Sequence, residues 1–316
     1  MRARLIVNPA SGTDRAAGLL PRINATLRTF VRDLDITITT EAEDAARAAA
    51  RALAERCDAL YVAGGDGTLN VVLRALFDTG AGPCTIPIGI VPLGTGNDFA
   101  KALDLGADPE GALEALLARR VVDVDVGTVN GRPFVNTSAG GFVADVSEAV
   151  TEGLKDVTGK LAYLIGGARA LLGSEPFMAR MRLPDDGSAL EWTGDVELQM
   201  FAICNARFIG GGYPIAPAAL IDDGLLDVFL VRRMPMLEFV RVLQAIAAGE
   251  HLHDERVQHF RASVFDLEFD RVVRVNTDGE LLQARSCHYR VRPRAARFFC
   301  GLHPFAATDP RKSDPV

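Results

Sequence analysis

The stretch Leu60-Tyr-Val-Ala-Gly-Gly-Asp-Gly-Thr68 decides the fold, because a glycine-rich loop in it joins a strand to a helix. Leu60–Ala63 is a continuous apolar run, which is typical of a strand buried on both faces of a parallel sheet. Glycines after such a strand let the backbone approach an anion, and the N–H groups at the start of the next helix point at it. We expect that helix to begin at about Thr68, and the stretch therefore predicts a phosphate-binding loop.

Asp66 lies among these glycines, although a bare carboxylate would repel a phosphate. Its presence is explained if Mg²⁺ or the water shell of Mg²⁺ lies between the carboxylate and the phosphate. The structural alternative is a tight turn with an acidic residue at the start of the helix. The strand, the glycines, the carboxylate and the helix occur together, and this combination favours the binding site.

Two further loops repeat the pattern. The apolar run Ile88–Val91 leads into Pro92-Leu-Gly-Thr-Gly-Asn-Asp98 and then a helix, and Asn8-Pro-Ala-Ser-Gly12 follows the first apolar run. Parallel strands end at the same edge of a sheet, so the three loops should lie together and hold a polyphosphate. Neither the Walker A sequence Gly-Lys-Ser/Thr nor the Rossmann sequence Gly-x-Gly-x-x-Gly occurs in the chain.

The order of the predicted elements divides the chain into two parts. Up to about residue 120, strands alternate with helices, of which Glu43–Arg56 is the clearest because acids begin it and an arginine ends it. After residue 121, Asn130-Gly131 and Asp278-Gly279 predict β-hairpins. Helices are expected at about 159–172 and 235–248. Strands are expected at Phe177–Leu183, Asp195–Cys204, Leu226–Val231, Val264–Phe269 and Val272–Asn276.

The fold class that follows is α/β plus mainly β. An N-terminal α/β nucleotide-binding domain with a parallel sheet is followed by an antiparallel β-sandwich-like domain, and the chain end returns to the first domain. We assign residues 1–125 and about 293–305 to the first domain, and residues 126–292 to the second. Residues 306–316 are polar and contain proline, and we expect a disordered tail there.

Composition narrows the function. The chain has 316 residues, of which 48% are hydrophobic and 24% are charged, as expected of a two-domain globular protein. A net charge of −7 argues against nucleic-acid binding. No stretch approaches the roughly 18 apolar residues that a membrane-spanning helix needs. The five cysteines are odd in number and scattered, which favours a reducing, cytoplasmic location.

Two later features have alternative interpretations. His251-x-His253 could hold a metal, but a solvated loop after a helix is the more common structure. A group of arginines either lies on the solvated faces of a strand and a helix or forms a patch that faces ATP or an anionic membrane. These arginines are Arg285, Arg290, Arg292, Arg294 and Arg297.

The three loops resemble those of the diacylglycerol kinase catalytic-domain family, and within it the chain is similar to the soluble bacterial lipid kinases. The first glycine-rich loop alone is shared with NAD kinases and resembles a loop of phosphofructokinases, so the later motifs select the family. The likeness covers nearly the whole chain in order. The motifs are Asn8-Pro-Ala-Ser-Gly12, Gly64-Gly-Asp-Gly-Thr-Leu-Asn70, Pro92-Leu-Gly-Thr-Gly-Asn-Asp-Phe99, Asn136-x-x-x-Gly140-Gly-Phe142, Gly210-Gly-Gly-Tyr213, Ala216-Pro-x-Ala219-x-x-x-Asp223-Gly-x-Leu226-Asp227 and Asn276-x-Asp278-Gly-Glu280.

This resemblance implies an ATP site on the first domain. In similar proteins a threonine at the end of the second strand also contacts ATP. Here that residue is Thr39 or Thr40, and counting back from Asp44-Ala45 favours Thr39. The implied nucleotide-binding residues are Asn8, Thr39, Gly64, Gly65, Asp66, Gly67, Thr68, Asn70, Gly94 and Thr95.

The resemblance also implies the catalytic groups. The Mg²⁺ network of the family maps onto Asp66, Asp98 and Asp125. Asp123 shares a strand face with Asp125, so periodicity leaves both open, and the resemblance selects Asp125. Glu280 corresponds to the proposed general base, which would orient the lipid hydroxyl and accept its proton late. A surface acid of a hairpin is the structural alternative for Glu280.

A second, structural Mg²⁺ is implied for the β-rich part. Asp223 and the backbone carbonyls of Leu220 and Leu225 would hold it, since hard cations favour oxygen ligands. An Asp-Gly turn that enters a strand is the structural alternative.

The implied function is ATP- and Mg²⁺-dependent phosphorylation of the hydroxyl of diacylglycerol or a related lipid alcohol. The lipid would be collected at the inner face of a membrane without a transmembrane segment, and residues 153–173, with Tyr163, are a candidate lid or lipid contact, or else a core helix. Similar proteins can form homodimers. The rival functions are an NAD kinase-like small-molecule kinase and a nucleotide-binding module without catalysis, and the retained carboxylates argue against the second rival.

Overall fold

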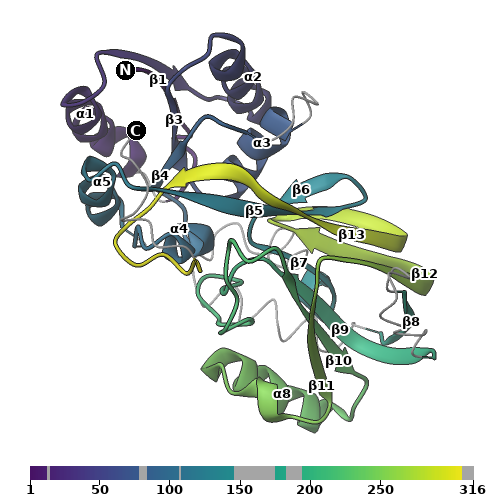
Figure 1. Ribbon diagram of the computed structural model, residues 1–316. Helices are drawn as coiled ribbons and strands as arrows, with labels where there is room; N and C mark the ends of the chain where they lie inside the picture. The colour runs from purple at the N-terminus through teal and green to yellow at the C-terminus, as the bar shows by residue number, and fades with distance from the viewer. Residues whose placement is uncertain (13–14, 78–83, 107, 146–174, 183–193, 308–316) are drawn as a thin grey trace. The chain divides into compact units, whose positions relative to one another are not determined.

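The computed structural model describes residues 1–12, 15–77, 84–106, 108–145, 175–182 and 194–307 (Figure 1). The chain forms two compact units. The first contains Met1–Val126, Leu220–Asp223 and Arg292–Val316, and the second contains Gly127–Ala219 and Gly224–Val291.

The first unit contains a parallel sheet in the order β13, β4, β3, β1, β2, of which only the end of the long strand β13 belongs here. Every residue of β3 is buried, which explains the continuous apolar run in its sequence. The α/β fold class of the first part is therefore confirmed. The strands are β1 (Arg2–Val7), β2 (Asp33–Ile38), β3 (Ala59–Gly64), β4 (Ile88–Pro92) and β13 (Glu280–Phe299).

Helices cover both faces of this sheet, with α1 and α5 on one side and α2 and α3 on the other (Figure 1). Helix α3 begins at Asp66, two residues before the expected start at Thr68. The amide of Leu69 already donates to the carbonyl of Gly65 (3.1 Å), so the first helical turn includes the loop glycines. The helices are α1 (Arg15–Arg28), α2 (Ala42–Ala54), α3 (Asp66–Phe77), α4 (Asp98–Ala102) and α5 (Pro109–Leu117).

The chain end completes the first unit. Phe298 of β13 pairs with Ile88 of β4 in parallel register. Beyond the strand, the amide of Cys300 donates to the carbonyl of Arg120 (3.0 Å). The amide of Phe305 then donates to the carbonyl of Ala102 at the end of α4 (2.9 Å). Segment 220–223 joins the same unit, because the amide of Ile221 donates to the Phe305 carbonyl (2.9 Å).

The second unit is mostly antiparallel, in the order β11, β10, β9, β7, β12, β13, with β8 pairing with β12 and β9. Two buried apolar clusters form its core, one of them around Phe201, Phe265 and Tyr289 and the other around Phe142 and Phe239. This arrangement confirms the predicted mainly β class. Its elements are β5 (Val121–Val129), β6 (Arg132–Phe134), β7 (Thr137–Gly141), β8 (Phe177–Arg182), β9 (Val196–Cys204), β10 (Leu226–Arg232), α8 (Met236–Ala248), the 3₁₀ helix η1 (His251–His253), β11 (Val257–Ala262) and β12 (Val264–Thr277).

Both predicted hairpin turns are present. Asn130-Gly131 and Asp278-Gly279 each have two successive residues with positive φ, the conformation of a two-residue hairpin turn. The separate strands expected at Val264–Phe269 and Val272–Asn276 are wrong, because one strand, β12, runs through both. Its register against β13 shifts between Glu268 and Val273, so the chain stays extended while a few residues leave the ladder.

Three other expectations need correction or lie outside the described residues. His251 is not in a solvated loop: it is 1% exposed, and its Nε2 lies 2.9 Å from the carbonyl oxygen of Ile215. The late arginines all lie on β13, without the expected helix. Some expectations concern residues that the structure does not describe, namely the predicted helix at 159–172, the candidate lid at 153–173 and residues 308–316 of the expected tail. Ala307 of that tail is described, and its amide donates to Asp222 Oδ1. None of the described helices is long and apolar enough to cross a membrane.

Candidate functional site

Three loops of the first unit meet after β1, β3 and β4. A Cβ atom on Gly12 would lie 2.1 Å from the carbonyl oxygen of Leu93, and one on Gly94 would lie 2.7 Å from the Cα of Gly65. Real Cβ atoms do not approach backbone so closely, so no larger side chain fits at these contacts. The loops therefore form a surface built of main chain, as an anion-binding loop requires.

Polar side chains hold the loops in place. Asn8 Nδ2 donates to Thr68 Oγ1 (2.9 Å), and Ser11 Oγ lies 3.3 Å from the same oxygen. Ser11 Oγ also accepts the amide of Gly65 (3.3 Å). Asn97 adopts a left-handed conformation with φ of 51° and donates from Nδ2 to the carbonyl of Gly94 (2.7 Å). The amide of Leu93 donates to the carbonyl of Gly64 (2.9 Å), so the three predicted loops are joined by hydrogen bonds as well as by packing.

Asp66 and Asp98 are brought together at this surface. Asp66 Oδ2 accepts the amide of Asp98 (3.2 Å), and its Oδ1 accepts the amide of Phe99 (3.4 Å). Burial raises the pKa of Asp66, and the neighbouring Asp98 carboxylate raises it further. The positive charge of Lys101 lowers the pKa of Asp66 in turn. The Nζ of Lys101 lies 3.0 Å from Asp98 Oδ1.

This pair of carboxylates fits a Mg²⁺ ion. Two like charges in a partly buried place raise each other's electrostatic energy, and a divalent cation would relieve that repulsion. Over the ranges that the structure describes, no three His, Cys, Asp or Glu side chains are grouped so that they could hold a metal. Mg²⁺ commonly binds through one or two carboxylates, with water and substrate phosphates as its other ligands, so the two aspartates suffice.

The other predicted nucleotide-binding residues lie on or beside these loops. Gly67 and Thr95 are exposed, whereas Asn70 is buried inside α3. Thr39 follows β2 directly, is 6% exposed and donates its amide to the carbonyl of Val7 (2.9 Å). The hydroxyl of Thr40 instead donates to Asp44 Oδ2 (2.8 Å) at the start of α2. The Thr40 hydroxyl is thus already engaged by the Asp44 carboxylate.

Asp125 has a different set of partners. Its carboxylate is completely buried, and Oδ1 accepts the amide of Arg294 (2.7 Å), a residue with φ of 49°. Its own amide donates to the carbonyl of Ile221 (2.7 Å). Asp123 is exposed and pairs with Arg297 (3.1 Å). Asp125 thus holds the chain end and segment 220–223 in place, and its part in a Mg²⁺ network stays a prediction.

In the second unit, Glu280 begins β13 next to a strongly held turn. The carboxylate of Asp278, 9% exposed, accepts three successive backbone amides, from Val135 (2.8 Å), Asn136 (3.2 Å) and Thr137 (2.8 Å). Glu280 is two residues further on, half-buried, and its strand position is therefore fixed by Asp278. The sequence marks Asp278 only as a turn residue within a family motif, since nothing local shows partners about 140 positions away.

Buried hydroxyl groups support the same turn. Thr277 Oγ1 lies 2.9 Å from Ser138 Oγ, which lies 3.0 Å from the phenol oxygen of Tyr289. Burial raises the pKa of Tyr289 far above its ordinary value, so the phenol stays protonated and can donate. The strand that carries Glu280 is thus anchored on both sides of its turn.

The residues predicted for a structural Mg²⁺ are divided between the units. Leu220 and Asp223 belong to the first unit, and Leu225 belongs to the second. Gly224 between them has φ of 77°, as expected of an Asp-Gly turn. A metal at this turn stays a prediction.

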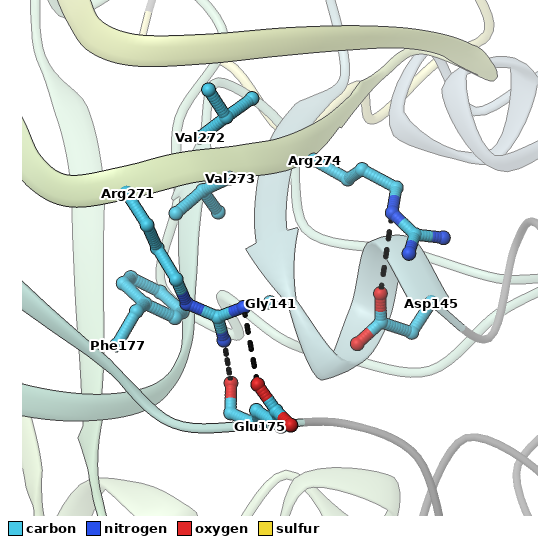
Figure 2. A pocket seen from close by; sticks show the side chains of 8 residues that line it. All are labelled: Gly141, Asp145, Glu175, Phe177, Arg271, Val272, Val273 and Arg274. Atoms are coloured by element: carbon cyan, nitrogen blue, oxygen red, sulfur yellow. Dashed lines mark hydrogen bonds and ion pairs between the residues drawn. The ribbon is translucent and has the colours of Figure 1, made fainter.

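A cavity of about 260 Å³ lies in the second unit, beside Gly141, Phe177 and the bulge of β12. Figure 2 shows the guanidinium group of Arg271 turned toward Glu175, whose carbonyl oxygen it meets at 2.6 Å, and Arg274 Nε is 4.0 Å from Asp145. Each guanidinium group of this cavity faces a carboxylate. The cavity therefore lacks the excess positive charge expected of a phosphate site.

Comparisons with known proteins agree with this geometry. The family model for the diacylglycerol kinase catalytic domain matches residues 2–129, and that for the YegS C-terminal NAD kinase beta sandwich-like domain matches residues 137–300. A diacylglycerol kinase of Staphylococcus carnosus is 32% identical over 281 residues, which cover 88% of each chain. A Pseudomonas aeruginosa protein named "Probable lipid kinase YegS-like" is 36% identical over 266 residues, which cover 84% of each chain.

A solved structure shares the whole fold. The crystal structure of a "putative diacylglycerol kinase" from Bacillus anthracis str. Sterne superposes with a TM-score of 0.79 at 27% identity, and the match covers 95% of each chain. The family models and the relatives extend over both units. The chain belongs to the diacylglycerol kinase family.

Proposed function

We propose that this protein transfers a phosphoryl group from ATP to the hydroxyl of diacylglycerol or a related lipid alcohol, with Mg²⁺ as cofactor. The observation that carries the proposal is the meeting of three glycine-rich loops beside the paired carboxylates of Asp66 and Asp98. Main-chain N–H groups can bind phosphate oxygens, and a pair of carboxylates beside them can bind the metal ion that accompanies a polyphosphate. The lipid class comes from the names of the relatives.

ATP would bind to the loops of the first unit. Mg²⁺ would neutralise charge on the phosphates when bound at Asp66 and Asp98. The loop amides would hold the phosphate oxygens, so that most of the catalysis is positioning and charge stabilisation. Residues that would contact the nucleotide are Asn8, Thr39, Gly64, Gly65, Gly67, Thr68, Asn70, Gly94 and Thr95.

Glu280 would act on the acceptor. A carboxylate is a much weaker base than an alkoxide, so it orients the lipid hydroxyl and accepts the proton late in the transfer. The buried hydrogen bonds of Asp278 support this role, because they fix the backbone two residues before Glu280. The second unit would thus present the lipid, and the protein would meet its substrate at the inner face of the membrane. Asp223, with the carbonyls of Leu220 and Leu225, would hold a structural Mg²⁺, and Asp125 would support the catalytic one.

The direct test is transfer of labelled phosphate from ATP to a panel of lipid alcohols, with NAD as a rival acceptor. Asp66→Ala and Glu280→Ala should each lower the lipid kinase rate by at least about a thousandfold, while circular dichroism shows a folded protein. Asp123→Ala and Glu268→Ala remove exposed carboxylates from the same two units and should retain activity. Full activity in Asp66→Ala or Glu280→Ala would disprove that residue's role, and transfer to NAD alone would replace the lipid assignment.

A further inference from the structure

Lys101 is an unusual residue in this chain. The sequence has 34 basic residues, and only four of these are lysine, namely Lys101, Lys155, Lys160 and Lys312. Over the ranges that the structure describes, Lys101 is the one lysine, and it lies on α4, where its Nζ contacts the Asp98 carboxylate. Arginine serves for nearly every other cation of the protein. A lysine at this position therefore suggests a need for a compact charge.

Lys101 contacts the side chain of Asp98, whose backbone amide in turn donates to Asp66. Its Nζ is 3.0 Å from Asp98 Oδ1, and the two side chains are 22% and 5% exposed. Asp66 accepts the amides of Asp98 and Phe99, so the two carboxylates and the ammonium group share one end of α4. The formal charge of the three groups is −2 + 1 = −1. Without the lysine it would be −2, and the pair would attract a cation more strongly and repel a phosphate more strongly.

We propose that Lys101 is a positioning residue that acts as an internal counter-ion and makes metal binding at this site depend on the nucleotide. The ammonium group holds Asp98 beside Asp66 and weakens the attraction of the pair for a divalent ion alone. It also lowers the repulsion between the pair and the phosphates of ATP. The site then binds Mg²⁺ together with ATP in preference to Mg²⁺ by itself. This inference rests on the proposed use of Asp66 and Asp98 as the Mg²⁺ site.

A lysine suits this task better than an arginine. Its ammonium group is a point charge on a flexible stem, which can shift when the carboxylate takes a new partner. A guanidinium group binds a carboxylate through two parallel N–H groups and would release it less readily. The contact between residues 98 and 101, one turn apart on α4, needs no other element to hold it.

The test separates metal binding from nucleotide binding in the full-length protein. Mn²⁺, followed by electron paramagnetic resonance, is titrated without nucleotide, and ATP is titrated calorimetrically in EDTA. In Lys101→Met, Mn²⁺ affinity should rise and ATP affinity should fall, each about three- to tenfold, as expected for one charge beside a partly exposed site. Lys101→Arg keeps the charge and should shift neither affinity as far as Lys101→Met does. Arg51→Met removes an exposed cation of α2 and should change neither.

The opposite signs of the two shifts are the signature of a counter-ion. Equal losses in both titrations would mean that Lys101 only supports the local structure, and unchanged affinities would mean that its charge is not felt; either result overturns the inference. If Lys101→Met does not fold, Lys101→Gln carries the same expectation. If the Mn²⁺ and ATP affinities shift in opposite directions but no lipid is phosphorylated, the role of Lys101 is supported and the proposed lipid acceptor is wrong. If the wild-type protein binds neither Mn²⁺ nor ATP, both the role of Lys101 and the proposed kinase function are wrong.

Discussion

The loop surface of the first unit and the turn that precedes Glu280 in the second are built in opposite ways. The loop surface is made of main chain, and its glycines leave no room for side chains at contacts such as Gly65 with Gly94. The turn is held by a buried side chain, since the Asp278 carboxylate accepts three amides from residues 135–137. Adding a side-chain atom should therefore destabilise the loop surface, and removing the buried carboxylate should destabilise the turn.

The largest effect on stability should come from Asp278→Ala. Three backbone amides in a buried place would lose their acceptor, and each unsatisfied group costs about 1–3 kcal/mol. We expect the free energy of unfolding to fall by about 3 kcal/mol or more, measured by urea denaturation. Asp266→Ala, which removes the contact between the Asp266 carboxylate and Nδ1 of the exposed His288 (2.8 Å), should cost less than about 1 kcal/mol. Equal losses for the two variants would show that the turn does not depend on its buried carboxylate.

An added methyl group should damage the loop surface next. In Gly94→Ala the new Cβ would meet the backbone of Gly65 at 2.7 Å, and the loops must separate. We expect a loss of about 1–3 kcal/mol in unfolding free energy, typical of overpacking, together with weaker ATP binding by calorimetry. Gly18→Ala adds the same methyl group to α1 with no neighbour within 4 Å, and it should stabilise the protein by about 0.5–1 kcal/mol. Unchanged ATP affinity in Gly94→Ala would mean that the close contact of the two loops is not required for binding.

Two buried tyrosines allow a finer version of the comparison. The hydroxyl of Tyr289 lies 3.0 Å from Ser138 Oγ, whereas the hydroxyl of Tyr61, on β3, has no hydrogen-bond partner within the described part of the chain. Tyr289→Phe should lower the melting temperature, since the hydrogen bond is worth about 1 kcal/mol. Tyr61→Phe should raise it slightly, because a buried polar group without a partner disappears. A decrease of equal size in both variants would contradict the difference between the two sites.

The smallest expected effect concerns Asp66 in the absence of metal. Its pKa in the folded protein lies above the ordinary value of 3.8, so the folded state binds a proton more readily than the unfolded chain. The contribution of this carboxyl group to stability therefore falls as the pH rises from about 3.8 through the folded pKa. In EDTA at neutral pH, Asp66→Asn should be the more stable form by about 1 kcal/mol or less, although it is expected to be inactive. The difference should shrink on acidification or when Mg²⁺ is added, and a difference that is independent of pH would contradict the raised pKa.

The sequence predicted those parts of the fold that local patterns encode. The buried strand β3, the glycine loops and the two hairpin turns each depend on a few neighbouring residues, and each is found where it was expected. The apolar pattern predicts two strands in place of β12, because the bulge residues around Asp270 interrupt the pattern without ending the strand. The sequence favours a solvated loop for His251 because its partner, the carbonyl of Ile215, lies 36 positions earlier.

The same limit applies to the candidate site. Asp66 and Asp98 stand out in the sequence because they follow strands and glycines, and the structure brings them together. Lys101 and Asp278 do not stand out, since a lysine on a helix and an aspartate in a turn are common. Their importance comes from partners, Asp98 for the one and residues 135–137 for the other, which only the folded chain reveals.

The path of the chain has a consequence for its synthesis. The first unit takes strands from the N-terminal part, but its sheet is complete only when the end of β13 pairs with β4 and the amide of Phe305 reaches Ala102. Residues 127–291, apart from Leu220–Asp223, are made in between and belong to the other unit. The nascent chain must therefore carry the three glycine-rich loops on an unfinished sheet until Phe305 has left the ribosome. A gene fragment that stops after β5 would encode every glycine loop and still lack the strand that closes their scaffold.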